Sequence, residues 1–179
     1  LLTDARALLE GIAQAFGGEL AGDPRRWRDV NEEFAVVCSG SDPEPLLARF
    51  EGLAQIVAIV ERSERRAVGV TVGGVPVELV VAEPGRFGTA LVRATGTRAY
   101  VEALEPLPDA PDEEGVYAAL GIPFCPPELR EEPFRGEPPP LVELGDICGD
   151  LHVHTDWSDG KATVLEMGEA ARARGYEYL

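Results

Sequence analysis

The sequence predicts an α+β fold, and three observations support this class. The chain has 179 residues, 45% of them hydrophobic, with 20 glycines and 15 prolines, which suits one or two compact domains. Apolar residues recur at helical spacing over residues 3–17, and Gly17-Gly18 ends that pattern. Short β-rich segments separated by turn residues follow it. We therefore expect a largely antiparallel sheet that packs against a few helices.

The expected elements follow one another along the first 120 residues. The pattern predicts short strands, with a helix over 43–52 between the second and the third, at residues 18–21, 34–38, 56–60, 67–72 and 75–81. Gly73-Gly74 is typical of a hairpin turn, and Pro76 places its strand near an edge or near its own first residues. Helical patterning returns over 84–105 and again over 113–120.

The composition changes in the last third of the chain. Ten of the fifteen prolines fall between Pro106 and Pro140, which predicts an extended, solvated inter-domain linker. Residues 147–153 then resemble a strand, and Thr163-x-x-Glu166 is a capping box that opens a helix running to about residue 174. Residues 176–179 have the pattern of a second strand, so we expect the beginning of a β-α-β unit.

The charge balance is strongly acidic. The 32 acidic and 16 basic residues give a formal net charge of -16 and a pI near 4.4, whereas a free-standing nucleic-acid binder is normally basic. The three cysteines are odd in number and widely spaced, so a disulfide framework is not expected. There is no secretory signal pattern and no long apolar run, so we expect a cytoplasmic protein without a membrane partner.

The most specific chemical pattern is His152-Val153-His154, with Asp159 five residues further on. Side chains two residues apart on a strand share one face, so both imidazoles can reach a single ion. Imidazole and carboxylate ligands suit zinc, manganese or iron and leave room for an activated water molecule. The alternative is that this pair is only polar surface on an exposed strand.

The string H-x-H-T-x-x-S-D-G at residues 152–160 resembles the opening motif of PHP domains, the polymerase-and-histidinol-phosphatase superfamily of metal-dependent phosphoesterases. The resemblance covers 147–179 and implies the first strand and helix of a (βα)7 barrel. It implies that His152, His154 and Asp159 ligate Mn2+ or Zn2+. The other ligands of that family come from later strands, so this segment alone is expected to be inactive.

The first part of the chain resembles the palm and thumb of a family X DNA polymerase of the bacterial and archaeal type that carries a C-terminal PHP domain. The residues that carry this resemblance are Gly22-Asp23-Pro24-Arg25-Arg26 and, after five further residues, Glu32-Glu33-Phe34-Ala35. The segment 94–99 resembles the palm–thumb boundary. The resemblance implies a nucleotidyltransferase-like palm over 1–95, which includes the end of a helical region at 3–17. It further implies a thumb-like remnant over 96–122, a Pro-rich acidic linker over 123–146 and the PHP beginning over 147–179.

The same resemblance assigns candidate roles in the palm. Gly22, Arg25 and Arg26 match nucleotide-binding positions, and Glu33 and Glu78 stand where metal-binding aspartates would hold Mg2+ or Mn2+. The remaining aspartate position is occupied by Ala35, which cannot ligate an ion. Because two-metal nucleotidyl transfer needs a full set of oxygen ligands, we expect this polymerase site to be degraded.

Each palm residue also has a structural alternative. Arg25 and Arg26 can simply solvate a strand end, and Glu32-Glu33 can be an exposed turn. Trp27 is expected in the core rather than as a base-stacking platform.

Three functions follow from these patterns. The first is part of a monomeric DNA-repair polymerase with a PHP-type 3′–5′ exonuclease, a hydrolase that acts on DNA with a 3′ end and also binds nucleotide. The second is a PHP phosphoesterase for a small phosphorylated metabolite, with the palm as an interaction module. The third is a structural palm without catalysis.

Overall fold

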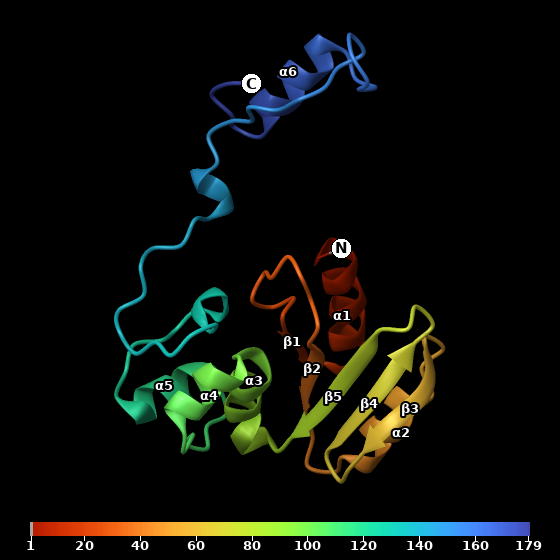
Figure 1. The fold of residues 1–179 in the computed structure, drawn as a ribbon, viewed down its shortest axis with the longest axis vertical. Coiled ribbons are helices and arrows are strands. Elements are labelled where there is room, and N and C mark those ends of the chain that lie inside the picture. Colours follow the sequence, from red (N-terminus) through yellow and green to blue (C-terminus); the bar gives the residue numbers. More distant parts are fainter. Residues whose placement is uncertain (1) are drawn as a thin grey trace. The chain divides into compact units, whose positions relative to one another are not determined.

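The computed structural model describes residues 2–179 and divides the chain into two compact units, Leu1–Pro138 and Pro139–Leu179 (Figure 1). Each unit is described by itself. Within residues 2–179, the helices are too short or too polar to span a bilayer.

A five-stranded sheet forms the centre of the first unit. Its strands are β1 (Glu19–Gly22), β2 (Phe34–Ser39), β3 (Ile56–Arg62), β4 (Arg66–Thr71) and β5 (Pro76–Ala82), in the spatial order β1-β2-β5-β4-β3. The β2–β5 pair is parallel and the other three pairs are antiparallel, which confirms the mostly antiparallel sheet. Pro76 is the first residue of β5, where the missing N–H costs least.

Two helices cover one face of this sheet. Helix α1 (Leu2–Phe16) buries Leu9, Ile12 and Phe16, and α2 (Glu44–Glu51) buries Leu47 and Phe50. These side chains form one hydrophobic cluster with Ala67 of β4 and with alternate residues of β2 and β5. The 3.6-residue period of the helices and the two-residue period of the strands therefore meet in a single core.

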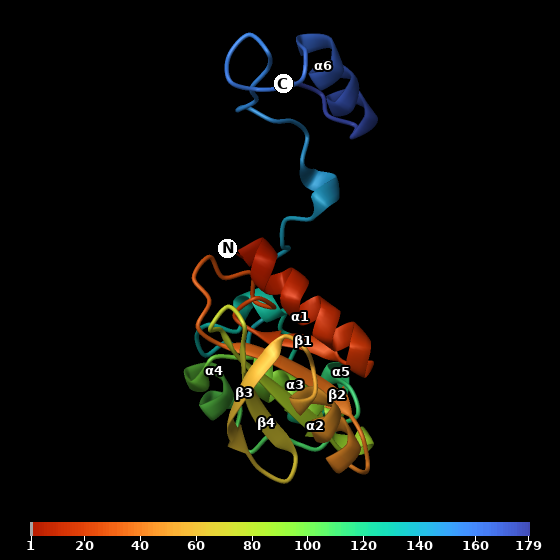
Figure 2. The same ribbon diagram turned by 90° about the vertical axis from the view of Figure 1, so that its right-hand side faces the viewer.

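The opposite face is only partly covered. Helix α3 (Phe87–Thr95) packs over β1 and β2 and buries Leu91 against Ala35, Val37 and Ala82. It is the green helix beside the sheet in Figure 1, and Figure 2 shows the same elements from the side. Because α3 contacts mainly these two strands, the β4 side of this face is left open for a cleft.

A second core holds the helical part of the unit together. After the short 3-10 turn η1 (Pro84–Arg86) and α3 come α4 (Arg98–Leu104) and α5 (Glu113–Leu120). Tyr100 and Tyr117 are buried, and their hydroxyl oxygens lie 2.8 Å apart. The side chains of Thr97 and Asp112 accept the N-terminal N–H groups of α4 and α5, which satisfies donors that the helices leave unpaired.

The prediction of a solvated linker is wrong for residues 123–134. Between residues 123 and 134 the chain turns through η2 (Pro127–Leu129) and packs onto the helices, with Cys125 1% exposed and Arg130 0% exposed. The Thr97 backbone N–H donates to the Arg130 carbonyl at 3.0 Å. Proline content restricts φ but does not decide burial, and here the turn directs Arg130 inward toward an acidic partner.

The second unit contains η3 (Leu144–Asp146) and α6 (Val164–Ala173). Thr163 and Glu166 form the predicted capping box, with both reciprocal hydrogen bonds. The strand expected over 147–153 is reduced to one parallel bridge between Gly149 and Tyr178, because the rest of the segment has no ladder partner within residues 2–179. The parallel direction agrees with the β-α-β expectation, whereas the barrel remains a prediction.

The close packing of α3 on the segment before α5 provides a test of the second core. A Cβ placed on Gly88 would lie 2.0 Å from the Asp112 carbonyl carbon, so Gly88→Ala must push these segments apart. We expect a loss of about 1–3 kcal/mol in the free energy of unfolding, measured by urea denaturation. Gly85→Ala is the matched control, because nothing lies within 4 Å of its Cβ position. Equal stability of the two variants would contradict this packing.

Candidate functional site

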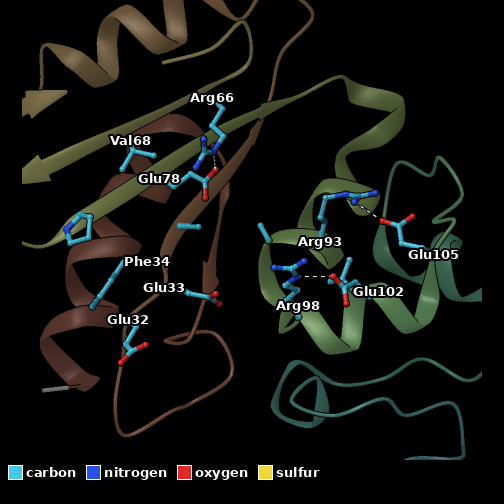
Figure 3. A pocket seen from close by; sticks show the side chains of 15 residues that line it. Glu32, Glu33, Phe34, Arg66, Val68, Glu78, Arg93, Arg98, Glu102 and Glu105 are labelled. Atoms are coloured by element: carbon cyan, nitrogen blue, oxygen red, sulfur yellow. Dashed lines mark hydrogen bonds and ion pairs between the residues drawn. The ribbon is translucent and has the colours of Figure 1, made fainter. Parts of the chain in front are cut away.

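A cleft of about 500 Å³ lies on the open face of the sheet. In Figure 3, Glu33 and Glu78 lie on the sheet side of this cleft, and Arg93 and Arg98 lie on its helical side. The parallel pairing of β2 with β5 places Ala35 directly opposite Glu78, and Glu33 precedes Ala35 by two residues. The structure therefore brings together the three positions that the sequence predicted for a metal-binding cluster.

The acidic residues of this cleft are engaged by arginines. Arg66 Nε donates to Glu78, and Arg66 Nη1 donates to Glu61. The hydrogen bonds that Arg66 donates to these two carboxylates, the one to Glu61 most strongly, raise the pKa of Arg66 above its ordinary value. Glu33 is 62% exposed and lies 3.6 Å from Arg26 Nη1. An ion at this cleft would have to compete with Arg66 for Glu78, and Ala35 would supply it with no ligand.

The predicted nucleotide-binding turn is closed by its own side chains. The Asp23 carboxylate accepts the backbone N–H groups of Glu32 and Glu33 at 2.6 and 2.8 Å, and it also pairs with Arg26. Arg26 is 5% exposed, and its Nε donates to Glu131 at 2.8 Å. Two backbone N–H groups and a guanidinium would suit a phosphate, but here a carboxylate of the same chain fills that position.

Arg25 is joined to the helical part of the unit. Its two Nη atoms each donate to a different oxygen of the Glu113 carboxylate at 2.8 Å, and Nη1 also donates to Thr95 Oγ1 at 2.8 Å. Glu113 accepts a third hydrogen bond from Nη1 of the fully buried Arg130. Burial alone would raise the pKa of Glu113, but the hydrogen bonds from Arg25 and Arg130 outweigh it and lower that pKa.

Arg130 completes this cluster through aromatic contacts. Its guanidinium carbon lies 5.4 Å from the Tyr117 ring centroid and 5.5 Å from that of Phe124. Arg130 Nη2 has no hydrogen-bond partner within residues 2–179. The two aromatic faces provide the electrostatic compensation that this nitrogen needs.

The expectation that Trp27 lies in the core is wrong. The residue has φ 59° and is 55% exposed, so it is not part of the core. Its ring lies 3.9 Å from the guanidinium carbon of Arg6, which stacks over it. The reversal of the chain after Arg26 requires the left-handed conformation, and this carries the indole to the surface.

The second unit brings the two histidines together. His152 Nε2 and His154 Nε2 lie 2.8 Å apart, and their ring centroids are separated by 4.9 Å. His154 Nδ1 lies 2.5 Å from Asp159 Oδ1, on the other side of the ring. The two Nε2 atoms are therefore within hydrogen-bonding distance of each other, and Asp159 fixes the orientation of the His154 ring from its other side. Over the described part of the chain, no group of three or more His, Cys, Asp or Glu residues is arranged to hold a metal ion.

Comparison with known proteins supports one of the predicted families. No protein-family model matches this chain. A stretch of 73 residues, 38% of the chain, is 45% identical to the DNA polymerase/3′-5′ exonuclease PolX of Bacillus subtilis (strain 168). This stretch is therefore similar to PolX. The similarity confirms the predicted resemblance to a family X DNA polymerase, while the PHP assignment of residues 147–179 remains a prediction. The matched stretch covers 13% of the PolX chain, so the two proteins are compared over a small part of that enzyme.

The sequence patterns do not reveal the acidic partners of the turn that carries Arg25 and Arg26. Glu113 was expected only as the start of a helix and Glu131 only as part of a linker, yet both bind arginines of this turn. These contacts join residues 88 and 105 positions apart, and no local pattern signals them.

The buried carboxylate of Glu113 has a measurable effect on stability. We expect Glu113→Gln to reduce the free energy of unfolding by about 3 kcal/mol at pH 7, because two guanidinium groups lose their charged partner. The pKa of Glu113 is lowered in the folded state from an ordinary value of 4.5, so its contribution is complete above that value. The difference from the wild type should therefore shrink as the pH falls through the lowered folded pKa.

The control for this experiment is Glu114→Gln, the exposed neighbour on the same helix turn. Its free energy of unfolding should change by less than about 1 kcal/mol. A loss for Glu114→Gln as large as that for Glu113→Gln, or a Glu113 effect that does not depend on pH, would contradict the assigned role.

Proposed function

We propose that this chain is part of a PolX-type DNA-repair protein in which His152 and His154 belong to a metal-dependent 3′–5′ exonuclease. The observation that carries the proposal is the 2.8 Å separation of the two Nε2 atoms. The similarity to PolX, whose name includes both a polymerase and a 3′-5′ exonuclease, supports the substrate class. DNA with a 3′ end is the proposed partner.

The donor set fits Mn2+ or Zn2+. Imidazole nitrogens bind zinc at about 2.0–2.1 Å, so two ligands of one tetrahedral ion lie roughly 3.3 Å apart. The observed pair is within a small ring rotation of that value. A bound ion would supply an acidified water molecule for attack on phosphorus. His152 and His154 would hold the ion, and Asp159 would keep the proton on His154 Nδ1 so that Nε2 presents its lone pair.

We further propose that the cleft of the first unit no longer supports ordinary nucleotide addition. Two-metal transfer needs a cluster of oxygen ligands that holds two ions about 3.5–4 Å apart. Ala35 removes one ligand, and Arg66 neutralises Glu78. Asp23 fills the position at which a triphosphate would meet the turn, and its charge would repel that group.

The exonuclease proposal is tested on the intact protein with single-stranded DNA and Mn2+. We expect 3′–5′ degradation, with His152→Ala and His154→Ala losing both bound metal and activity. Asp159→Asn should weaken metal binding by about 10- to 100-fold, because it acts through His154. Metal content by mass spectrometry is the second readout.

The matched control is Glu169→Ala, an exposed carboxylate of α6, which should keep full activity. Hydrolysis restricted to small phosphomonoesters would contradict the DNA substrate and favour a metabolite phosphoesterase. Absence of any bound metal would contradict the exonuclease and favour a structural role.

The polymerase proposal is tested by primer extension with the same protein and Mg2+. We expect little or no nucleotide addition, because the ligand set around Ala35 is incomplete. Robust extension that disappears in Glu33→Gln or Glu78→Gln would show that a working ion site persists there.

A further inference from the structure

The loop between His154 and Asp159 presents an indole ring to solvent. Trp157 is 90% exposed, the largest exposed fraction of any large hydrophobic side chain among residues 2–179. Trp27, by contrast, is 55% exposed and lies against Arg6. An aromatic face this exposed is available to stack on a partner.

The loop that carries Trp157 has a defined backbone. The N–H groups of Ser158 and Gly160 both donate to the Thr155 carbonyl, at 2.9 and 3.0 Å. The Asp156 N–H donates to the Ala162 carbonyl at 2.9 Å, and the Trp157 N–H donates to Thr155 Oγ1 at 3.3 Å. These bonds already order the backbone at Trp157, so ligand binding would carry little entropic cost for ordering this loop.

Gly160 packs against the backbone of His154, the residue that precedes the loop. A Cβ at this position would lie 2.5 Å from the carbonyl carbon of His154, so the chain folds back directly onto that histidine. The side chains of His154 and Asp159 meet at 2.5 Å. Trp157 therefore lies within a closed loop whose base is the proposed metal-binding histidine.

The charges around this loop favour contact of its side chains with a nucleobase of DNA rather than with a phosphate. Residues 149–162 contain three carboxylates and one basic residue, Lys161. Phosphates would be attracted by a bound ion but repelled by these carboxylates. Stacking on an aromatic ring needs no positive charge, because every nucleobase has a π face.

We propose that Trp157 stacks on a nucleobase of the DNA strand whose terminal phosphodiester lies at the His152–His154 pair. The inference rests on the proposed exonuclease function and adds the residue that positions its substrate. Since stacking tolerates all four bases, recognition through Trp157 would select single-stranded ends without sequence preference.

The first test is binding, measured on the intact protein in EDTA so that no hydrolysis occurs. Addition of a single-stranded oligodeoxynucleotide should quench indole fluorescence in the wild type, and Trp157→Phe should lose most of that quenching. Trp157→Ala should weaken binding by about 5- to 150-fold, whereas Trp157→Phe should keep most of the affinity. An oligonucleotide with abasic sites at its 3′ end should bind the wild type and Trp157→Ala equally.

The second test separates stacking from chemistry. With Mn2+, Trp157→Ala should raise the KM for single-stranded DNA and leave unchanged the hydrolysis of bis(p-nitrophenyl) phosphate, a diester without a base. Unchanged affinity and KM for DNA in Trp157→Ala would overturn the inference while the exonuclease stands. An equal loss on both substrates, or a lowered melting temperature, would show that Trp157 is structural and would also overturn it. If the wild type hydrolyses neither substrate, the proposed function fails, and quenching in EDTA still decides whether Trp157 contacts DNA.

Discussion

The first unit depends on the buried ion pairs that the Glu113 carboxylate forms with two arginines. The carboxylate accepts hydrogen bonds from Arg25 in the turn after β1 and from Arg130 in the segment after α5. The sheet, the helices and residues 123–134 are thus joined at one buried charged group. Because two guanidiniums surround it, Glu113 stays ionised although burial opposes its charge.

This cluster has a consequence for the cleft beside it. Guanidinium groups that bind carboxylates in a bidentate manner use the geometry that would otherwise bind phosphate. Arg25 is occupied by Glu113, and Arg26 is occupied by Asp23 and Glu131. The arginine pair of the turn therefore serves the fold. By contrast, the two imidazoles of the second unit contact each other through their Nε2 atoms, 2.8 Å apart.

The division between the units follows from packing. The prolines between 106 and 140 look alike in sequence, but those near Arg130 lie beside buried side chains of the first unit, whereas Pro139 and Pro140 belong to the second unit. What separates them is whether a buried partner exists for the side chains nearby. Cys125 and Arg130 meet Tyr100, Tyr117 and Glu113, and such partners cannot be identified from local composition.

Local patterns in the amino-acid sequence predicted the five strands, the helices α1, α2, α5 and α6, and one helical region over 84–105 that the structure divides into α3 and α4. Periodicity, caps and turn residues act over a few positions, so they can be read without the tertiary structure. These patterns also located the cluster of Glu33, Ala35 and Glu78, through the resemblance to family X polymerases. They could not assign partners to Arg25, Arg26 or Glu78, nor place Trp27 at the surface. Those outcomes depend on side chains distant in the chain and on one backbone reversal. Long-range charge pairing is decided only when the tertiary fold brings the groups into the same dry environment, since spacing along the chain says nothing about which carboxylate a buried arginine will meet.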